Sequence, residues 1–246
     1  MGPREFYPEI ASTQDRAIEL ARSGAPEGTR VIAAAQSRGR GRLDHVWVSP
    51  PGGVYLSIVL RAPSEHATLL PLALGARLAH ELSARYAAPF RVKWPNDVLL
   101  APGAEPARKI GGILVDRVED AGTDAIVVAG MGVNVSSDPA AFPPSVRVRR
   151  VSLAEIAPEP PTLEAIEALV VRSAMRAAIG LRGPGGVEAT RALCRRWLWG
   201  VGRRATIDEE EAGTITGIGD EGELLLEREG APVVIRAGEV RVEGTA

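Results

Sequence analysis

Cysteine is nearly absent from this chain of 246 residues, which excludes several classes of protein. The single Cys194 has no partner for an internal disulfide, so the chain is not a disulfide-stabilised scaffold. The three histidines, His45, His66 and His80, include no pair at metal-ligand spacing, so we expect no structural metal. No apolar run approaches the ~18 residues of a membrane-spanning helix, and the N-terminus lacks a secretory signal. We therefore expect a cytoplasmic protein without a membrane partner.

Lysine is almost as scarce, although basic residues are common. The 29 basic residues include only two lysines, Lys93 and Lys109, and the formal net charge is -2. This slightly acidic balance argues against nucleic-acid binding. The two lysines flank a Pro-Asn-Asp turn and lie beside a Gly-Gly pair, where a compact ammonium group suits an anionic ligand. The alternative is that two lysines survive by chance in an arginine-rich chain.

Apolar periodicity divides the first 200 residues into helices and strands. Ser12 or Thr13 is the predicted N-cap of a first helix, and Gly24 is its predicted stop. Residues 36–47 show no apolar periodicity, so we expect a loop there. The spacing predicts strands at 31–35, 54–60, 90–94, 98–100 and 125–129, and helices at 68–86, 163–180 and 187–199.

The segment from Asp97 to Asp116 is typical of a β-hairpin with a loop at 101–108. If Leu100 faces Lys109, Asp97 lies opposite Gly112. A carboxylate would then stand beside a position without a side chain, where a ligand can approach the backbone. A register slip of one residue would remove this arrangement.

The C-terminal segment has a different pattern. Five short β runs, at 205–207, 213–218, 223–226, 232–235 and 239–242, are separated by acidic or glycine turns. Their even spacing predicts a small β-barrel. We therefore divide the chain into a main domain, 1–200, and a C-terminal domain, 201–246.

The first candidate for chemistry is the arginine-glycine loop that ends near Trp47. Arg40 and Arg42 are two residues apart, so in an extended loop both guanidinium groups project to one side and can bind a single phosphate or carboxylate. Gly41 between them allows the backbone to wrap around the anion. The alternatives are a solvated basic loop and a patch that binds nucleic acid.

Three further motifs follow in the chain. Residues 93–97 (KWPND) predict a turn that directs Asp97 to a fixed place at the start of a strand, and an ordinary turn is the alternative. Residues 109–114 (KIGGIL) place an ammonium group beside bare backbone, although a surface lysine at a strand end is equally ordinary. Residues 130–135 (GMGVNV) lack the third glycine of a dinucleotide site, so a Rossmann site is disfavoured.

The order of these elements resembles the biotin–protein ligases over about residues 8–243. The helix start, the GRGR loop with its tryptophan, KWPND, K-x-GGIL, GxGxNV and a small β tail occur in that order. The resemblance implies an α+β fold, with a mixed β-sheet catalytic domain flanked by helices and a small C-terminal SH3-like β-barrel. Since the signature begins at Ser12, it also implies the monofunctional type, which has no N-terminal DNA-binding domain.

The resemblance also implies roles for individual residues. Lys109, Arg42 and Asp97 would be catalytic, and Asp97 would face a magnesium ion and the incoming amine. The biotin pocket would be lined by Ser12, Thr13, Gln14, Gln36, Arg40, Gly41, Arg42, Lys109 and Gly112. The nucleotide would contact Arg40, Arg42, Trp47, Lys109 and Asn134.

Two positions depart from the family pattern. Gln14 stands where the family often has asparagine, a change of one methylene. Leu43, Asp44 and His45 follow the GRGR motif where many members have a glycine and a basic residue. This leaves His45 as the candidate for the third basic contact of the loop.

The implied activity is a ligation in two steps. With ATP and Mg²⁺ the enzyme would convert biotin to biotinyl-5'-AMP and transfer it to a lysine of a biotin carboxyl carrier domain. A monomer or homodimer without DNA binding is expected. One rival is a lipoate or octanoate ligase or transferase on the same fold, although the transferase route needs a cysteine near the site and Cys194 is far from every motif. A non-catalytic module that binds RNA or another anion is the second rival.

Overall fold

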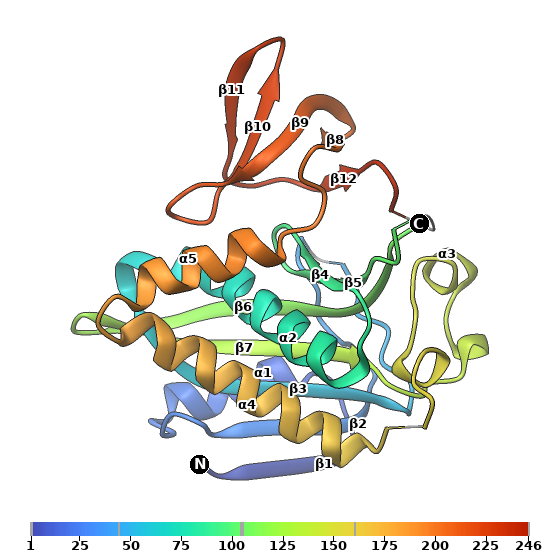
Figure 1. Ribbon diagram of the computed structural model, residues 1–246. Helices are drawn as coiled ribbons and strands as arrows, with labels where there is room; N and C mark the ends of the chain where they lie inside the picture. Colours follow the sequence, from blue (N-terminus) through green and yellow to red (C-terminus); the bar gives the residue numbers. More distant parts are fainter. Residues whose placement is uncertain (1, 44, 104–105, 160, 246) are drawn as a thin grey trace.

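The computed structural model describes residues 2–43, 45–103, 106–159 and 161–245, and its centre is a seven-stranded mixed sheet (Figure 1). The strand order is β1-β2-β3-β7-β6-β5-β4, and β1 pairs with β2 in parallel while the other neighbours are antiparallel. The bounds are Arg4–Ile10 (β1), Arg30–Gln36 (β2), Gly53–Pro63 (β3), Phe90–Lys93 (β4), Asp97–Leu100 (β5), Arg108–Ala121 (β6) and Asp124–Asn134 (β7). The expected mixed sheet with flanking helices is confirmed.

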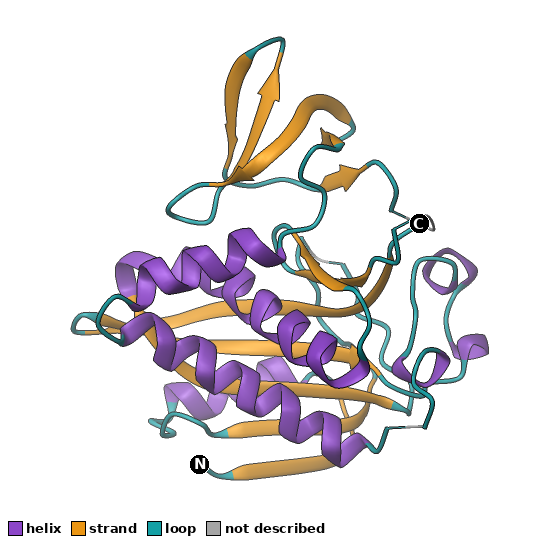
Figure 2. Ribbon diagram, viewed as in Figure 1, coloured by secondary structure: helices purple, strands orange, loops and turns teal. Residues whose placement is uncertain are grey.

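Helices cover both faces of this sheet (Figure 2). α1 (Thr13–Arg22) packs on one face against β3 and β7, whereas α2 (Leu70–Tyr86), α4 (Leu163–Arg182) and α5 (Gly186–Trp197) cover the other. Short helical segments are η1 (Ser64–Leu69), η2 (Pro139–Ala141), α3 (Pro144–Arg147) and η3 (Leu153–Glu155). None of the helices in the described ranges is long and apolar enough to cross a membrane.

The start of α1 brings polar side chains to the sheet. Ser12 is the N-cap, as predicted, and its Oγ accepts a hydrogen bond from the Asp15 amide at 3.4 Å. Thr13 and Gln14 occupy the first turn and are buried against the sheet. The sheet-facing side of a helix is normally apolar, but at the N-terminal end of α1 it is polar. Buried polar side chains at this position indicate a ligand-binding site.

The sequence pattern predicts no strand before the first helix, yet β1 forms the sheet edge there. Pro8 and the charged residues of this segment obscure the strand pattern, and they are tolerated because β1 pairs on one side only, with β2.

The hairpin register was predicted correctly at the site and incorrectly at the loop. Asp97 pairs with Gly112 as expected. Lys109, however, pairs with Leu99, and Leu100 pairs with Arg108, because the register shifts between Val98 and Leu99. Such a bulge inserts one residue into one strand, so a register counted from the loop end cannot hold along the whole hairpin.

The C-terminal domain is a five-stranded antiparallel sheet rather than the expected closed barrel. Its order is β11-β10-β9-β8-β12, and in the described residues the edge strands β11 and β12 do not pair. The sheet is consistent with an SH3-like domain. Its strands are Arg204–Ile207 (β8), Glu210–Ile218 (β9), Leu224–Arg228 (β10), Ala231–Ile235 (β11) and Val240–Val242 (β12).

The turn between β9 and β10 connects the two sheets. Trp94 Nε1 donates a hydrogen bond to the Gly222 carbonyl at 2.7 Å, and Thr68 Oγ1 donates to the Glu221 carbonyl at 3.1 Å. Arg191 Nε donates to the Asp220 carbonyl at 2.8 Å. The buried cores of the two sheets also form one continuous cluster. The C-terminal sheet is thus bonded to the tryptophan of the KWPND turn.

Candidate active site

A cavity of about 1090 Å³ opens beside α1 and extends to the C-terminal sheet. Its walls come from the first turn of α1, the loop after β2, strands β5 to β7 and the segment around β12. Many of the predicted site residues lie together in it: Thr13, Gln14, Gln36, Arg40, Gly41, Arg42, Trp47, Asp97, Lys109, Gly112 and Asn134. Ser12 does not line the cavity, because its side chain caps α1.

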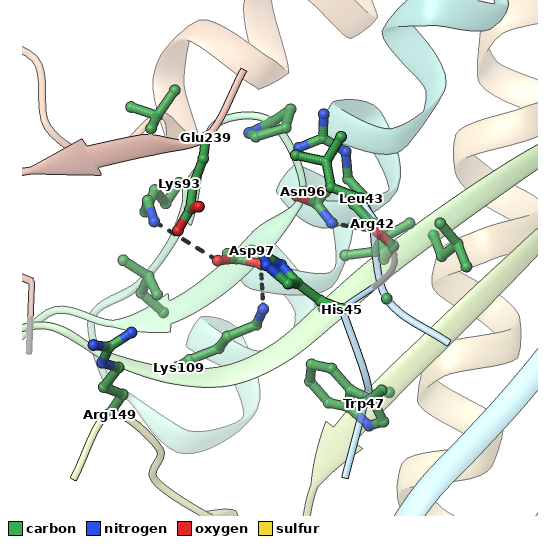
Figure 3. A pocket seen from close by; sticks show the side chains of 18 of the residues that line it. Arg42, Leu43, His45, Trp47, Lys93, Asn96, Asp97, Lys109, Arg149 and Glu239 are labelled. Carbon is green, nitrogen blue, oxygen red and sulfur yellow. Dashed lines mark hydrogen bonds and ion pairs between the residues drawn. The ribbon is translucent and has the colours of Figure 1, made fainter. Parts of the chain in front are cut away.

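Asp97 stands between the two lysines of the chain (Figure 3). Its carboxylate is 2.5 Å from Lys109 Nζ and 3.8 Å from Lys93 Nζ. Asn96 holds the turn on β6, because its Nδ2 donates to the Ile113 carbonyl at 2.6 Å and its own carbonyl accepts from the Ile113 amide at 3.0 Å. The rigid turn therefore presents one carboxylate to two ammonium groups.

Burial and charge act in opposite directions on this cluster. Burial raises the pKa of Asp97, but Lys109, Lys93 and Arg42 outweigh it and hold this pKa below its usual value. Burial lowers the pKa of Lys93, partly offset by Asp97. It also lowers the pKa of Arg42, against the attraction of Asp97. Asp97 is thus outnumbered by the three cationic side chains around it, a set suited to an anion with several negative charges.

The indole of Trp47 packs against the main chain at two glycines, Gly112 and Gly132. A Cβ at Gly132 would come within 2.5 Å of the indole, and one at Gly112 within 2.9 Å. Lys109 Nζ is 5.0 Å from the centroid of the indole ring, in cation–π geometry. The glycines of the GG and GxG motifs therefore make room for a tryptophan that packs beside the catalytic lysine candidate.

A chain of hydroxyl and amide groups occupies the other end of the cavity. Thr13 Oγ1 is 3.0 Å from Gln36 Oε1 and 2.9 Å from Ser57 Oγ, and Ser57 Oγ is 2.9 Å from Gln14 Oε1. The two hydroxyl groups provide only two hydrogens for these three oxygen–oxygen contacts. One contact therefore lacks a hydrogen, and this group of side chains can accept a hydrogen bond from a ligand. Gly130 provides the space for Gln14, since a Cβ there would lie 2.5 Å from Oε1.

The two arginines of the loop are close to different carboxylates. Arg40 Nη1 is 2.9 Å from Asp15 and 3.2 Å from Asp116, while Arg42 is half-buried near Asp97. A shared clamp on one anion therefore stays a prediction. His45 of the same loop lines the cavity, and Asp44 lies outside the described residues.

Asn134 supports Lys109 from behind. Its Nδ2 donates to the Lys109 carbonyl at 3.3 Å and to the Val151 carbonyl at 3.2 Å. Lys109 is also held by backbone bonds to Arg149 and Val151. Contact of Asn134 with a nucleotide stays a prediction, and the bonds observed give this residue a part in positioning the lysine.

Several lining residues were missed in the sequence. Ser57 is a buried hydroxyl between Leu56 and Ile58 in a largely apolar strand, and this small polar residue was the available signal. Arg149 and Glu239 reach the cavity from remote segments and had no local signal (Figure 3). Glu239 directly precedes β12 of the C-terminal sheet, so both sheets contribute to the cavity.

The residues present do not form a preformed magnesium centre. No group of three His, Cys, Asp or Glu side chains suited to a metal occurs in the described part of the chain. Asp97 is paired with Lys109 and supplies one carboxylate. Mg²⁺ commonly binds through one or two carboxylates together with substrate phosphates. The site therefore fits a magnesium ion that arrives with a nucleotide.

Comparison with known proteins gives consistent matches. The sequence profile described as the biotin/lipoate A/B protein ligase family matches residues 7–134. The bifunctional ligase/repressor BirA of Bacillus subtilis is 32% identical over 92% of this chain and 70% of its own length, and the biotin–[acetyl-CoA-carboxylase] ligase of Mycobacterium tuberculosis is 28% identical over 94% and 86%. The structure of the biotin protein ligase from Aquifex aeolicus in complex with biotin and ATP superposes with a TM-score of 0.81 at 25% identity and covers 100% of both chains.

Proposed function

The chain belongs to the biotin/lipoate A/B protein ligase family, and we infer that it is a biotin–protein ligase. It uses ATP to convert biotin to biotinyl-5'-AMP and then transfers the biotinyl group to a lysine of a biotin carboxyl carrier domain. The relatives named as biotin–[acetyl-CoA-carboxylase] ligases and the similar structure with biotin and ATP support this activity.

The observation that favours biotin over lipoate or octanoate is the polar chain of Thr13, Ser57, Gln14 and Gln36. The cyclic urea of biotin has two N–H donors and one carbonyl acceptor, which match the hydroxyl and amide groups of these four side chains. The ring of lipoate and the tail of octanoate carry no hydrogen-bonding N–H or carbonyl group, so they would bury these polar side chains without ligand partners. A site built to hydrogen-bond its substrate rejects analogues that lack the matching groups.

In the first step, a biotin carboxylate oxygen attacks the α-phosphorus of ATP, and the bond to pyrophosphate breaks. Both reactants are anions, so the step requires fixed positive charge. We assign this role to Lys109 and Arg42, with Arg40 closing the loop and Trp47 packing below it. Asp97 would be the residue that holds a magnesium ion bound with ATP, and such an ion would neutralise further charge on the phosphates.

In the second step, the neutral amine of the acceptor lysine attacks the carbonyl carbon of the adenylate, and AMP leaves. The nitrogen loses one proton to water during this attack. A carboxylate whose pKa lies below its usual value is a weak base at neutral pH. We therefore assign Asp97 the role of orienting two groups, the acceptor amine and the ammonium group of Lys109.

The test is biotin transfer by the purified chain. We expect mass spectrometry to detect one biotinyl group on the acceptor lysine of a carrier domain, only when both ATP and biotin are present. Replacement of the acceptor lysine by arginine serves as the control. Labelling with lipoate or octanoate instead of biotin would contradict the proposed substrate.

The loop should discriminate adenylate from biotin through Arg42. Arg42→Ala should weaken binding of a non-hydrolysable biotinyl-adenylate analogue by about 1.5–3 kcal/mol more than binding of biotin, because the adenylate alone carries a phosphate. Calorimetry measures both affinities. Arg38→Ala, at an exposed position of the same loop, is the control and should change neither. Equal losses for both ligands with Arg42→Ala would contradict the assignment.

The turn between β9 and β10 should support activity through Trp94. Gly222 has φ +85°, and a Cβ there would lie 3.2–3.3 Å from Leu69. Gly222→Ala should therefore displace the turn, weaken the bond to Trp94 and slow adenylate formation about tenfold, a loss of ~1.4 kcal/mol. Gly230→Ala is the matched control, because Gly230 has φ +80° with nothing within 4 Å. Equal rates for the two variants would exclude this coupling.

A further inference from the structure

Asp116 has no assigned role, yet one of its oxygens contacts both parts of the site. It lies on β6, where it pairs with Val128 of β7. Its Oδ2 accepts a hydrogen bond from Gln14 Nε2 at 3.1 Å and lies 3.2 Å from Arg40 Nη1. A single carboxylate oxygen therefore joins the polar pocket to the arginine loop.

The carboxylate determines how the amide of Gln14 is oriented. An ionised carboxylate only accepts hydrogen bonds, so the amide nitrogen of Gln14 must face it. The second hydrogen of that nitrogen goes to the Val128 carbonyl at 3.0 Å. The amide oxygen is thereby turned towards Ser57, which donates to it at 2.9 Å. The direction of the whole polar chain depends on this orientation.

We propose that Asp116 is a positioning residue that couples the biotin pocket to the arginine loop. It sets the orientation of Gln14 in the pocket and anchors Arg40 in the loop with the same oxygen. Biotin in the pocket and the loop held at Asp116 then stabilise one another. This inference rests on the proposed ligase activity.

Asp15 provides an internal comparison. Its Oδ1 is 2.9 Å from the same Nη1 of Arg40, a shorter distance than that of Asp116. The side chain of Asp15 is 58% exposed against 28% for Asp116. No hydrogen bond between Asp15 and Gln14 occurs in the described residues. The two carboxylates thus share the arginine and differ in the link to the pocket.

The experiment compares Asp116→Asn with Asp15→Asn. We expect Asp116→Asn to raise the Kd for biotin without ATP about tenfold and to speed the release of biotinyl-5'-AMP about tenfold, because it affects both pocket and loop. Asp15→Asn should change the Kd for biotin less than twofold. Calorimetry and stopped-flow release of the adenylate provide these values. Asp116→Glu keeps the charge, so its Kd for biotin and its rate of adenylate release should both be close to the wild-type values.

A double-mutant cycle tests the coupling itself. When Asp116 is present, the effects of Gln14→Leu and Arg40→Ala on the rate of adenylate release should be non-additive. In the Asp116→Asn background the two effects should be additive. Additivity in both backgrounds, or equal effects of Asp116→Asn and Asp15→Asn on biotin affinity, would overturn the proposal. If Asp116→Asn does not fold, Asp116→Ser against Asp15→Ser decides the same point, because both remove the carboxylate. Failure of the wild-type chain to bind biotin would instead overturn the ligase activity.

Discussion

Lys109→Arg is expected to slow formation of the adenylate by on the order of 100-fold, the loss typical for removal of a fixed group that stabilises transition-state charge. The substitution keeps the positive charge but not its position. Lys109 Nζ is confined by Asp97, the ring of Trp47 and the bare backbone at Gly112. A planar guanidinium is longer and wider than an ammonium, so it cannot occupy this point.

The measurement is a single turnover with enzyme in excess over ATP. Arg108→Lys is the matched control, because it is a charge-preserving exchange at the neighbouring position, where the side chain lies 3.6 Å from Glu155 and is 36% exposed. Lys93→Arg is no silent control, since Lys93 is largely buried beside Asp97. A Lys109→Arg enzyme within a few-fold of the wild type would show that this lysine does not carry the first step.

Asp97→Asn is expected to damage both stability and transfer. The variant leaves Lys93 and Lys109 facing each other without the carboxylate between them. This ion pair is partly buried, so its loss should cost an amount between the ~1 kcal/mol of an exposed pair and the ~3–5 kcal/mol of a fully buried one. Transfer of preformed biotinyl-5'-AMP to the carrier domain should fall at least ~100-fold, because the amine is no longer oriented. Denaturant unfolding and single-turnover transfer measure the two effects.

The pH dependence of the Asp97 effect has a defined sign. The pKa of Asp97 in the folded chain lies below its ordinary value of about 3.9. Its contribution to stability is therefore fully present above that ordinary value and is lost as the pH falls through the lower folded-state pKa. The stability difference between wild type and Asp97→Asn should stay constant from pH 8 to about pH 5. A difference that already shrinks between pH 7 and pH 6 would contradict the pairing with the two lysines.

The sequence allowed much of the site to be predicted because its residues occur in short segments with strong backbone preferences. The pairing of Asp97 with Gly112 was predicted from an assumed pair of Leu100 with Lys109. That assumed pair is wrong, and the shift after Val98 nevertheless brings Asp97 opposite Gly112. The register at Lys109 could not be predicted, since nothing local marks the bulge after Val98.

The partners of the site residues could not be predicted in the same way. Ser57 and Asp116 contact Gln14 across separate strands and a helix, and only the folded sheet brings them together. Closure of the C-terminal sheet depends on whether β11 and β12 meet. Strand spacing indicates that strands exist but does not determine which edges pair.

The most direct test of the central claim is ATP–pyrophosphate exchange by the purified chain with biotin, lipoate and octanoate in parallel. This exchange reports the formation of an acyl-adenylate from each acid and requires no carrier protein. The hydroxyl–amide chain around Gln14 predicts exchange that depends on biotin and is at least ~100-fold slower with the two other acids. Exchange with lipoate or octanoate at a rate equal to that with biotin would contradict this account of the pocket.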